Sequence, residues 1–157
     1  MITKEILEKS AFSCIKYCNK EERIVFEENK TKYTAKNPNK KNILAFRVDN
    51  GYIKSTETKK CDFALIVEED ICYLIELKGK SVSVAAVQLL TTLELFLKQN
   101  PDMKRFLCRS IHTKISTHKI ENENSKKLRK ELIKLNKTFY STTNSYLIKE
   151  TNFVETI

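Results

Sequence analysis

The fold is decided by residues 62–78, which read DFALIVEEDICYLIELK. Two apolar runs of strand length, 62–67 and 71–78, flank the acidic residues 68–70. Runs of this kind, rich in β-branched and aromatic side chains and bounded by a polar turn, are typical of buried strands. We therefore expect a β-hairpin, and because both of its faces are apolar, we expect other elements to cover both.

The length of the hairpin loop sets which residues face each other. A three-residue loop places Val67 opposite Ile71 and therefore Asp62 opposite Glu76, with Cβ atoms about 4.5–5.5 Å apart. Lys78 shares the face of Glu76 because side chains alternate along a strand. Two carboxylates this close repel, and a divalent cation bound by their oxygens would reverse that penalty. A loop of two or four residues would put Asp62 on the other face, and a structural salt bridge to Lys78 would explain the same spacing.

The segments before the hairpin predict further elements. Apolar residues at helical spacing predict a helix over 3–18, with Thr3 as its N-cap. Residues 19–42 are polar and contain Pro38, so we expect mainly loop there, with a short strand near 23–27. Residues 43–54 contain the turn dipeptide Asn50-Gly51, which indicates a hairpin or a bent strand.

The segments after the hairpin complete the expected fold. The clearest helix is expected over 81–99, where Ser81 or Ser83 can cap the start and Pro101 ends it. A strand over 105–112, an amphipathic helix over 125–137 and an edge strand over 146–148 follow. This order predicts one α/β domain over residues 1–157, a three-layer α/β/α fold in which helices cover both faces of a central mixed sheet.

Composition limits the class of protein. The chain has 157 residues and a mass of 18.3 kDa, enough for one domain without disulfides. It contains no apolar run of membrane-spanning length and does not begin like a secretory signal, so we expect no membrane partner. Its five cysteines form no CxxC pair and indicate reduced thiols in a cytoplasmic protein, with Cys14 and Cys18 packed in the core from the first helix. Two isolated histidines, His112 and His118, are too few to indicate zinc.

The charge balance indicates a polyanionic partner. Lys and Arg number 29 against 20 Asp and Glu, a net charge of +9. Residues 30–60 hold nine basic residues and two acidic ones, directly before the hairpin. The excess of lysine over arginine has a plainer explanation in A-rich codons, and the basic face of the helix over 126–137 has a plainer one as a solvated face.

Asp62 and the run Tyr73-Leu74-Ile75-Glu76-Leu77-Lys78-Gly79-Lys80 resemble the core of the PD-(D/E)xK nuclease superfamily. In that pattern an Asp opens one strand, a Glu-x-Lys closes the next and a helix follows, within an α-β-β-β-α-β core. The resemblance covers residues 3–112 and implies a restriction-endonuclease-like core. Cys61 stands where the name-giving proline would be; that position holds no metal ligand, and members of the superfamily replace it.

The resemblance implies metal-dependent hydrolysis of a phosphodiester bond. Asp62 and Glu76, with the backbone carbonyl of Leu77, would hold Mg²⁺ or Mn²⁺. Lys78 would orient or deprotonate the attacking water, because a partly desolvated lysine has a lowered pKa. Gln88 in the following helix would lie near the scissile phosphate, although a solvated helix residue explains it equally well.

Further residues are weaker candidates for the same site. Lysines close to the motif could contact the nucleic-acid backbone: Lys59, Lys60 and Lys80. Acids on neighbouring elements could add a metal ligand: Asp49, and Glu8 or Glu5. For each of these acids a plain surface role is the simpler interpretation.

These features predict a small metal-dependent nuclease that acts on DNA. A chain of this size has little room for a recognition module, so DNA structure or a partner protein would select the substrate, and a resolvase-like homodimer is one form. Two alternatives stay open. One is a non-catalytic nucleic-acid- or protein-binding module that keeps the nuclease fold. The other is an unrelated α/β protein whose hairpin ends in a structural salt bridge.

Overall fold

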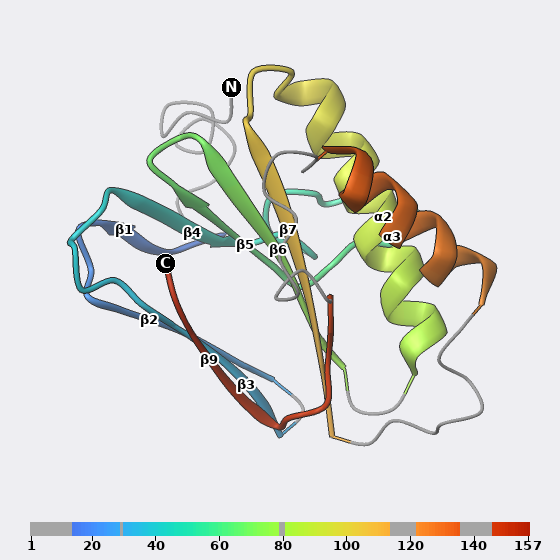
Figure 1. Cartoon of the computed structure of the whole chain (residues 1–157), viewed down its shortest axis with the longest axis horizontal. Coiled ribbons are helices and arrows are strands. Elements are labelled where there is room, and N and C mark those ends of the chain that lie inside the picture. Colours follow the sequence, from blue (N-terminus) through green and yellow to red (C-terminus); the bar gives the residue numbers. More distant parts are fainter. Residues whose placement is uncertain (1–13, 29, 79–80, 114–121, 136–145) are drawn as a thin grey trace.

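A computed structural model of the chain describes residues 14–28, 30–78, 81–113, 122–135 and 146–157, without the side chain of Lys78. This part of the chain forms an α/β structure with a mixed six-stranded sheet, a second sheet of three strands and two helices. The six-stranded sheet is the middle layer, with the helices on one face and the small sheet on the other (Figure 1).

The central sheet has the strand order β1-β4-β5-β6-β7-β8. Neighbouring strands are antiparallel from β1 to β6 and parallel from β6 to β8. The bounds of these strands are β1 Ile15–Asn19, β4 Ile43–Arg47, β5 Phe63–Val67, β6 Ile71–Lys78, β7 Arg105–His112 and β8 Leu147–Ile148. The parallel pairing of β6 with β7 is possible because a helix crosses over between them.

The predicted hairpin and its register are confirmed. Val67 pairs with Ile71 and Phe63 pairs with Ile75, so the loop has the three residues 68–70. The Asp70 amide donates a hydrogen bond to the Val67 carbonyl oxygen across the loop at 3.1 Å. The same register, continued by one residue, sets Asp62 opposite Glu76.

Both helices cover the same face of the central sheet. They are α2, Val82–Gln99, and α3, Glu123–Leu135. As predicted, Ser81 caps α2: its Oγ accepts a hydrogen bond from the Val84 amide at 3.4 Å. The helix ends at Gln99, with Asn100 as its C-cap directly before Pro101, as the sequence also predicts. Neither helix is long and apolar enough to span a membrane.

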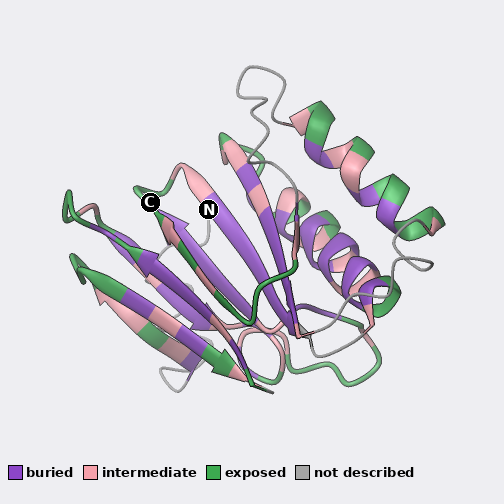
Figure 2. Cartoon of the chain, turned by 60° about the horizontal axis from the view of Figure 1, so that its bottom comes forward, coloured by how far each residue is buried: buried purple, intermediate pink, exposed green. Residues whose placement is uncertain are grey.

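The other face of the sheet is covered by strands, which corrects the expected helix–sheet–helix layering for the described part of the chain. The small sheet has the order β2-β3-β9, with β2 at Arg23–Glu28, β3 at Thr31–Lys36 and β9 at Asn152–Thr156. Phe26 of β2 stacks on Phe63 of the central sheet with ring centroids 4.5 Å apart. Figure 2 shows that the strands of the central sheet, which lie between the helices and the small sheet, are buried along most of their length.

Two of these strands were not expected. The strand near 23–27 is confirmed as β2, but β3 lies where a loop was predicted. Most of β3 is buried, including Tyr33 and Ala35, and only its two lysines, Lys32 and Lys36, are more exposed. The strand pairs with β2 and, in parallel, with β9. Its partner β9 is more than 100 residues away in sequence, so no local pattern announces the pairing.

The first predicted helix is wrong at its C-terminal end. Residues 15–19 form β1, which pairs antiparallel with β4, and Cys18 therefore lies on a strand. Ile15 and Tyr17 suit a strand edge, and pairing with β4 overrides the helical spacing of the apolar residues. The rest of that prediction, up to residue 13, lies outside the described residues.

The turn at Asn50-Gly51 bends the chain after β4, as predicted. Asn50 has a positive φ of 54°, and Asp49 forms a bridge with Ile53. A Cβ on Gly51 would lie 2.3 Å from the Arg47 carbonyl oxygen, so only glycine fits. This turn begins a segment that leads back to Asp62.

Candidate active site

Three neighbouring strands change from apolar to polar side chains at the same level of the face that packs against α2. Asp62 precedes β5 directly, Glu76 lies near the end of β6, and Ser110 and His112 end β7. Glu76 is paired with Ser110 in the parallel register. Glu76 and Asp62 each lie one residue beyond the last antiparallel pair, Phe63 with Ile75. We call these four residues the polar end of the sheet.

Asp62 is fixed against the backbone of β6. Its Oδ2 accepts a hydrogen bond from the Leu77 amide at 2.7 Å, and its own carbonyl accepts one from the Val48 amide at 2.8 Å. The Asp62 carboxylate thus lies against the backbone of Leu77, the residue that follows Glu76.

Glu76 lies at the buried centre of the polar end. Its exposed fraction is 0%, so its surroundings must offset the cost of burying a carboxylate. The charge of Glu76 acts on its neighbour Cys61. Burial, and then the negative charges of Glu76 and Asp62, raise the pKa of the Cys61 thiol well above its usual value. Cys61 is therefore a neutral packing residue at the position of the motif's proline.

Several predicted residues lie outside the described part of the chain. The backbone of Lys78 ends β6 and pairs with His112, but its side chain is not among the described groups. Lys80, Glu5 and Glu8 also lie outside. Their roles stay predictions.

Gln88 holds the segment that leads into Asp62. Its Nε2 donates a hydrogen bond to the Lys60 carbonyl oxygen at 2.9 Å. One helical turn later, the Thr92 hydroxyl accepts a hydrogen bond from the Cys61 amide at 2.9 Å and donates one to the Gln88 carbonyl at 2.8 Å. Gln88 is thus half-buried and bonded to backbone, not a plain solvated residue, and helix α2 fixes the start of β5.

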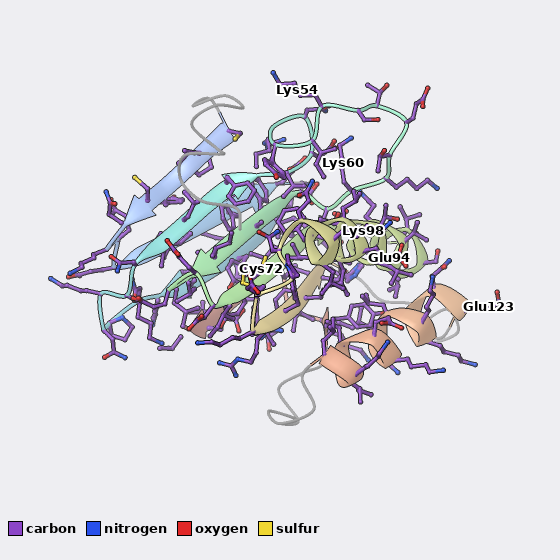
Figure 3. The ribbon with its side chains drawn as sticks, turned by 90° about the horizontal axis from the view of Figure 1, so that it is seen from above. Lys54, Lys60, Cys72, Glu94, Lys98 and Glu123 are labelled. Atoms are coloured by element: carbon purple, nitrogen blue, oxygen red, sulfur yellow. The ribbon has the colours of Figure 1, made fainter. Side chains whose placement is uncertain are left out.

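Lys60 and Asp49 do not take the roles expected for them. The Lys60 side chain is 3% exposed, and its ammonium lies 3.1 Å from Asp49 Oδ1. It also donates hydrogen bonds to the carbonyl oxygens of Ser55 and, at 3.1 Å, of Thr58. All three donors of the ammonium are used. Lys60 is therefore an internal clamp of the loop and not a phosphate contact, and Asp49 is its counter-ion. Figure 3 shows Lys60 inside the loop and Lys54 pointing outward.

Part of the basic excess of residues 30–60 is neutralised by ion pairs. Several of these residues pair with acids, some from outside that segment: Lys32 with Glu27, Lys40 with Glu22, Arg47 with Glu28 and Lys60 with Asp49. Lys59 remains exposed beside the clamp, close in sequence to Asp62. The structure thus retains Lys59, but not the whole segment, as a candidate phosphate contact.

The donor set decides which metals fit. Within the described ranges, no three or more His, Cys, Asp or Glu side chains form a group that could hold a metal ion. Two carboxylates and one carbonyl do not make a tetrahedral zinc site. They do fit Mg²⁺ or Mn²⁺, because Mg²⁺ binds through one or two carboxylates and keeps several waters or substrate oxygens as ligands.

Ser110 and His112 were not predicted to belong to the site. The Ser110 Oγ lies 2.6 Å from the His112 Nε2, and both side chains are 0% exposed. Alternation along β7 places them on one face with Phe106 and Cys108, a signal that the sequence does carry. Their position beside Glu76 depends on the parallel register with β6, which the sequence does not reveal.

Comparison of the chain with known proteins identifies no relative. No protein-family model, no curated protein and no solved structure matches the chain. The assignment of a function therefore rests on the residues of the polar end and on the motif that they form.

Proposed function

We propose that the chain is a metal-dependent nuclease of the PD-(D/E)xK type that hydrolyses phosphodiester bonds in DNA. The observation that supports the proposal is the β5–β6 register, which reaches Phe63 and Ile75 and, continued by one residue, sets Asp62 opposite Glu76. The Asp62 carboxylate lies on the backbone of Leu77, at the x position of the Glu-x-Lys motif.

The arrangement of elements supports a restriction-endonuclease-like core as part of this proposal. The chain runs through β4, β5, β6, α2 and β7 as strand, strand, strand, helix and strand. These four strands are neighbours in the central sheet, with β6 and β7 parallel. The resemblance implies this same succession after its first helix.

Each residue of the site has a distinct part in the proposed reaction. Asp62, Glu76 and the Leu77 carbonyl would hold Mg²⁺ or Mn²⁺, which when bound polarises the phosphoryl oxygen and lowers the pKa of a bound water. Lys78 would orient that water or take its proton. Gln88 would act through the backbone of residues 60 and 61, because it fixes the segment from which Asp62 projects.

The substrate and partners belong to the proposal as well. With Lys60 buried and several basic residues of 30–60 paired with acids, few basic groups among the described residues are left to contact a long duplex near Asp62. We therefore favour recognition of DNA structure, or of DNA held by a partner protein or by a second copy of this chain. The Lys59 side chain is exposed and could contact one backbone phosphate.

A second candidate is a binding module that keeps the nuclease fold without catalysis. The complete burial of Glu76 favours it, because a substrate phosphate needs a path to the cation. The two candidates differ in one measurable property: only the nuclease requires a cation site that depends on Asp62 and Glu76.

The test is a cleavage assay with Mg²⁺ and with Mn²⁺ on linear, single-stranded, flapped and four-way-junction DNA and on RNA. Glu76→Gln is the test variant, and Glu123→Gln, on the exposed start of α3, is the matched control. We expect metal-dependent cleavage that Glu76→Gln abolishes and Glu123→Gln leaves unchanged. Folded proteins that cut no substrate, or a Glu76→Gln variant that cuts normally, would contradict the proposal.

A further inference from the structure

We propose that Ser110 and His112 complete the cation site by binding the water ligands of the ion. This inference rests on the proposed function, because it assigns residues to the same site. It adds a third strand, β7, to a motif that the sequence confines to β5 and β6.

The position of Ser110 is set from both sides. In the parallel register it is paired with Glu76, so the two side chains are neighbours on the face beneath α2. On the other side, the Ser110 amide donates a hydrogen bond to the Tyr146 carbonyl at 2.6 Å. The backbone pairings on both sides thus fix the position of Ser110 beside Glu76 on this face.

The polarity of β7 at this level needs an explanation. The residues before Ser110 on the same face, Phe106 and Cys108, belong to the apolar core beneath the helices. A hydroxyl and an imidazole with no exposed surface then follow. Burying such groups costs free energy that apolar residues would avoid. The change occurs at the same level as Glu76 on β6, which indicates one shared polar site.

The ligand count assigns the two residues a role. Mg²⁺ requires six oxygen ligands, and the described protein atoms offer about three from Asp62, Glu76 and Leu77. The remaining ligands are waters or substrate oxygens, and outer groups that hydrogen-bond to such ligands orient them. A serine hydroxyl has one donor and two acceptor positions, so Ser110 can bond His112 and a water together.

His112 is a positioning residue in this arrangement. Its Nε2 lies 2.6 Å from the Ser110 Oγ and fixes the rotation of the hydroxyl. If the imidazole proton lies on Nε2, the serine proton points to the cation's water; if it lies on Nδ1, the serine oxygen accepts from that water. In both tautomers the pair gives Ser110 one defined direction.

The experiment measures Mn²⁺ binding by electron paramagnetic resonance, together with cleavage, in Ser110→Ala and His112→Leu. His112→Gln is the rescue variant, because its amide can place a nitrogen near the position of Nε2. Cys108→Ala is the matched control, since it removes a small buried side chain from the same strand and face but outside the polar end. Circular dichroism and thermal unfolding show that each variant is folded.

We expect Ser110→Ala and His112→Leu to weaken Mn²⁺ binding by about 10- to 100-fold and to change the line shape of bound Mn²⁺. We expect His112→Gln to recover most of that loss and Cys108→Ala to show none. Unchanged Mn²⁺ affinity in folded Ser110→Ala and His112→Leu, with a site that Glu76→Gln still removes, would overturn this inference and leave the nuclease standing. A wild-type protein with no Mn²⁺ site that depends on Glu76 would overturn both.

Discussion

Strand β7 carries two buried polar groups that point to opposite faces of the same sheet. On the small-sheet face, Arg109 forms a bidentate pair with Glu155 of β9, with nitrogen–oxygen distances of 3.0 and 2.8 Å. The Tyr33 hydroxyl donates a hydrogen bond to the same carboxylate at 2.8 Å, and Arg109 also donates one to the Cys108 carbonyl at 2.9 Å. On the helix face, the next residue, Ser110, lies beside Glu76, which faces a second carboxylate.

The two regions differ in how their charges are combined: the first pairs a cation with an anion, and the second contains two acids. Arg109 and Glu155 cancel each other, and burial followed by the negative charge of Glu155 raises the pKa of Tyr33 well above its usual value, which keeps its hydroxyl a donor. This cluster ties the C-terminal strand to the central sheet. The polar end instead places two acids on neighbouring strands, an arrangement that suits a cation under the proposed function. One residue along β7 thus separates the charge pair that holds β9 from the polar end, which under the proposed function holds the cation.

The largest effect is expected from removing one charge at the polar end. In Asp62→Asn the new amide oxygen can still accept the hydrogen bond from Leu77, but the negative charge is lost. We expect cleavage to fall by about 100- to 10,000-fold. The free energy of unfolding should change by less than about 1 kcal/mol, because repulsion with Glu76 is relieved.

Cleavage kinetics and urea unfolding measure the two quantities on the same preparation. A variant that loses stability while the folded fraction keeps full activity would make Asp62 a structural residue. Asp62 and the Arg109–Glu155 pair would then both be structural, and the proposed contrast between the two regions would be wrong.

The opposite outcome is expected at the Arg109–Glu155 pair. Its side chains are only 6% and 16% exposed, so Glu155→Gln leaves a buried guanidinium without its counter-ion. We expect a loss of about 3–5 kcal/mol in the free energy of unfolding, with the activity per folded molecule unchanged. Urea unfolding checks this, and the double variant Arg109→Met with Glu155→Leu should recover much of the loss. Equal stability of Glu155→Gln and wild type would contradict the structural role.

The Lys60 clamp lies between these extremes, because it is structural but adjoins the site. Lys60→Met removes two hydrogen bonds to backbone carbonyls and the ion pair with Asp49. We expect a loss of about 1–3 kcal/mol in stability, and a lower kcat because the segment before Asp62 loosens. Lys59→Gln, one residue earlier, is the matched control and should keep stability while lowering the salt dependence of DNA binding. The reverse result would restore Lys60 as a phosphate contact.

The smallest effect on stability is expected from ionisation of the buried thiols in the core beneath the helices. Burial raises the pKa of Cys108 to about 12 and raises the pKa values of Cys61 and Cys72 well above their usual range. Their contribution to stability is complete below the pKa of an unfolded thiol and is lost as the pH rises towards the folded values. We expect the free energy of unfolding to fall above pH ~9, by up to about 1.4 kcal/mol per pH unit for each thiol.

Urea unfolding between neutral pH and about pH 10.5 measures this slope. Cys108→Ala should lower the stability at neutral pH but flatten the decline at high pH. A slope that is the same in Cys108→Ala and wild type would show that this thiol already ionises in the folded protein.

What could be foreseen depended on how local the interaction was. The Ser81 cap, the strand over 105–112 and the hairpin register rest on neighbouring residues, and each is confirmed. Gln88 was foreseen as a site residue, but its bond to the Lys60 backbone was not. Lys60 itself was misjudged, because a lysine in a polar segment is usually exposed and only the folded loop supplies its three acceptors.

The two strands of the hairpin and the alternation of their side chains could be predicted from residues 62–78 alone, because both depend on near neighbours. The three-residue loop was one of several that the sequence allows, and the Val67–Ile71 pairing selects it and with it the register that, continued by one residue, sets Asp62 opposite Glu76. Tertiary packing sets which elements lie next to this hairpin, namely strand β7 beside it and the small sheet on its other face. The β6–β7 register depends on how α2 packs, and it alone brings Ser110 and His112 to Glu76. The pairing of β3 with β9 joins distant segments, so it alone places a sheet where a helix was expected. Contacts that close long loops are selected by the packing of the whole core, and no short stretch of sequence contains that information.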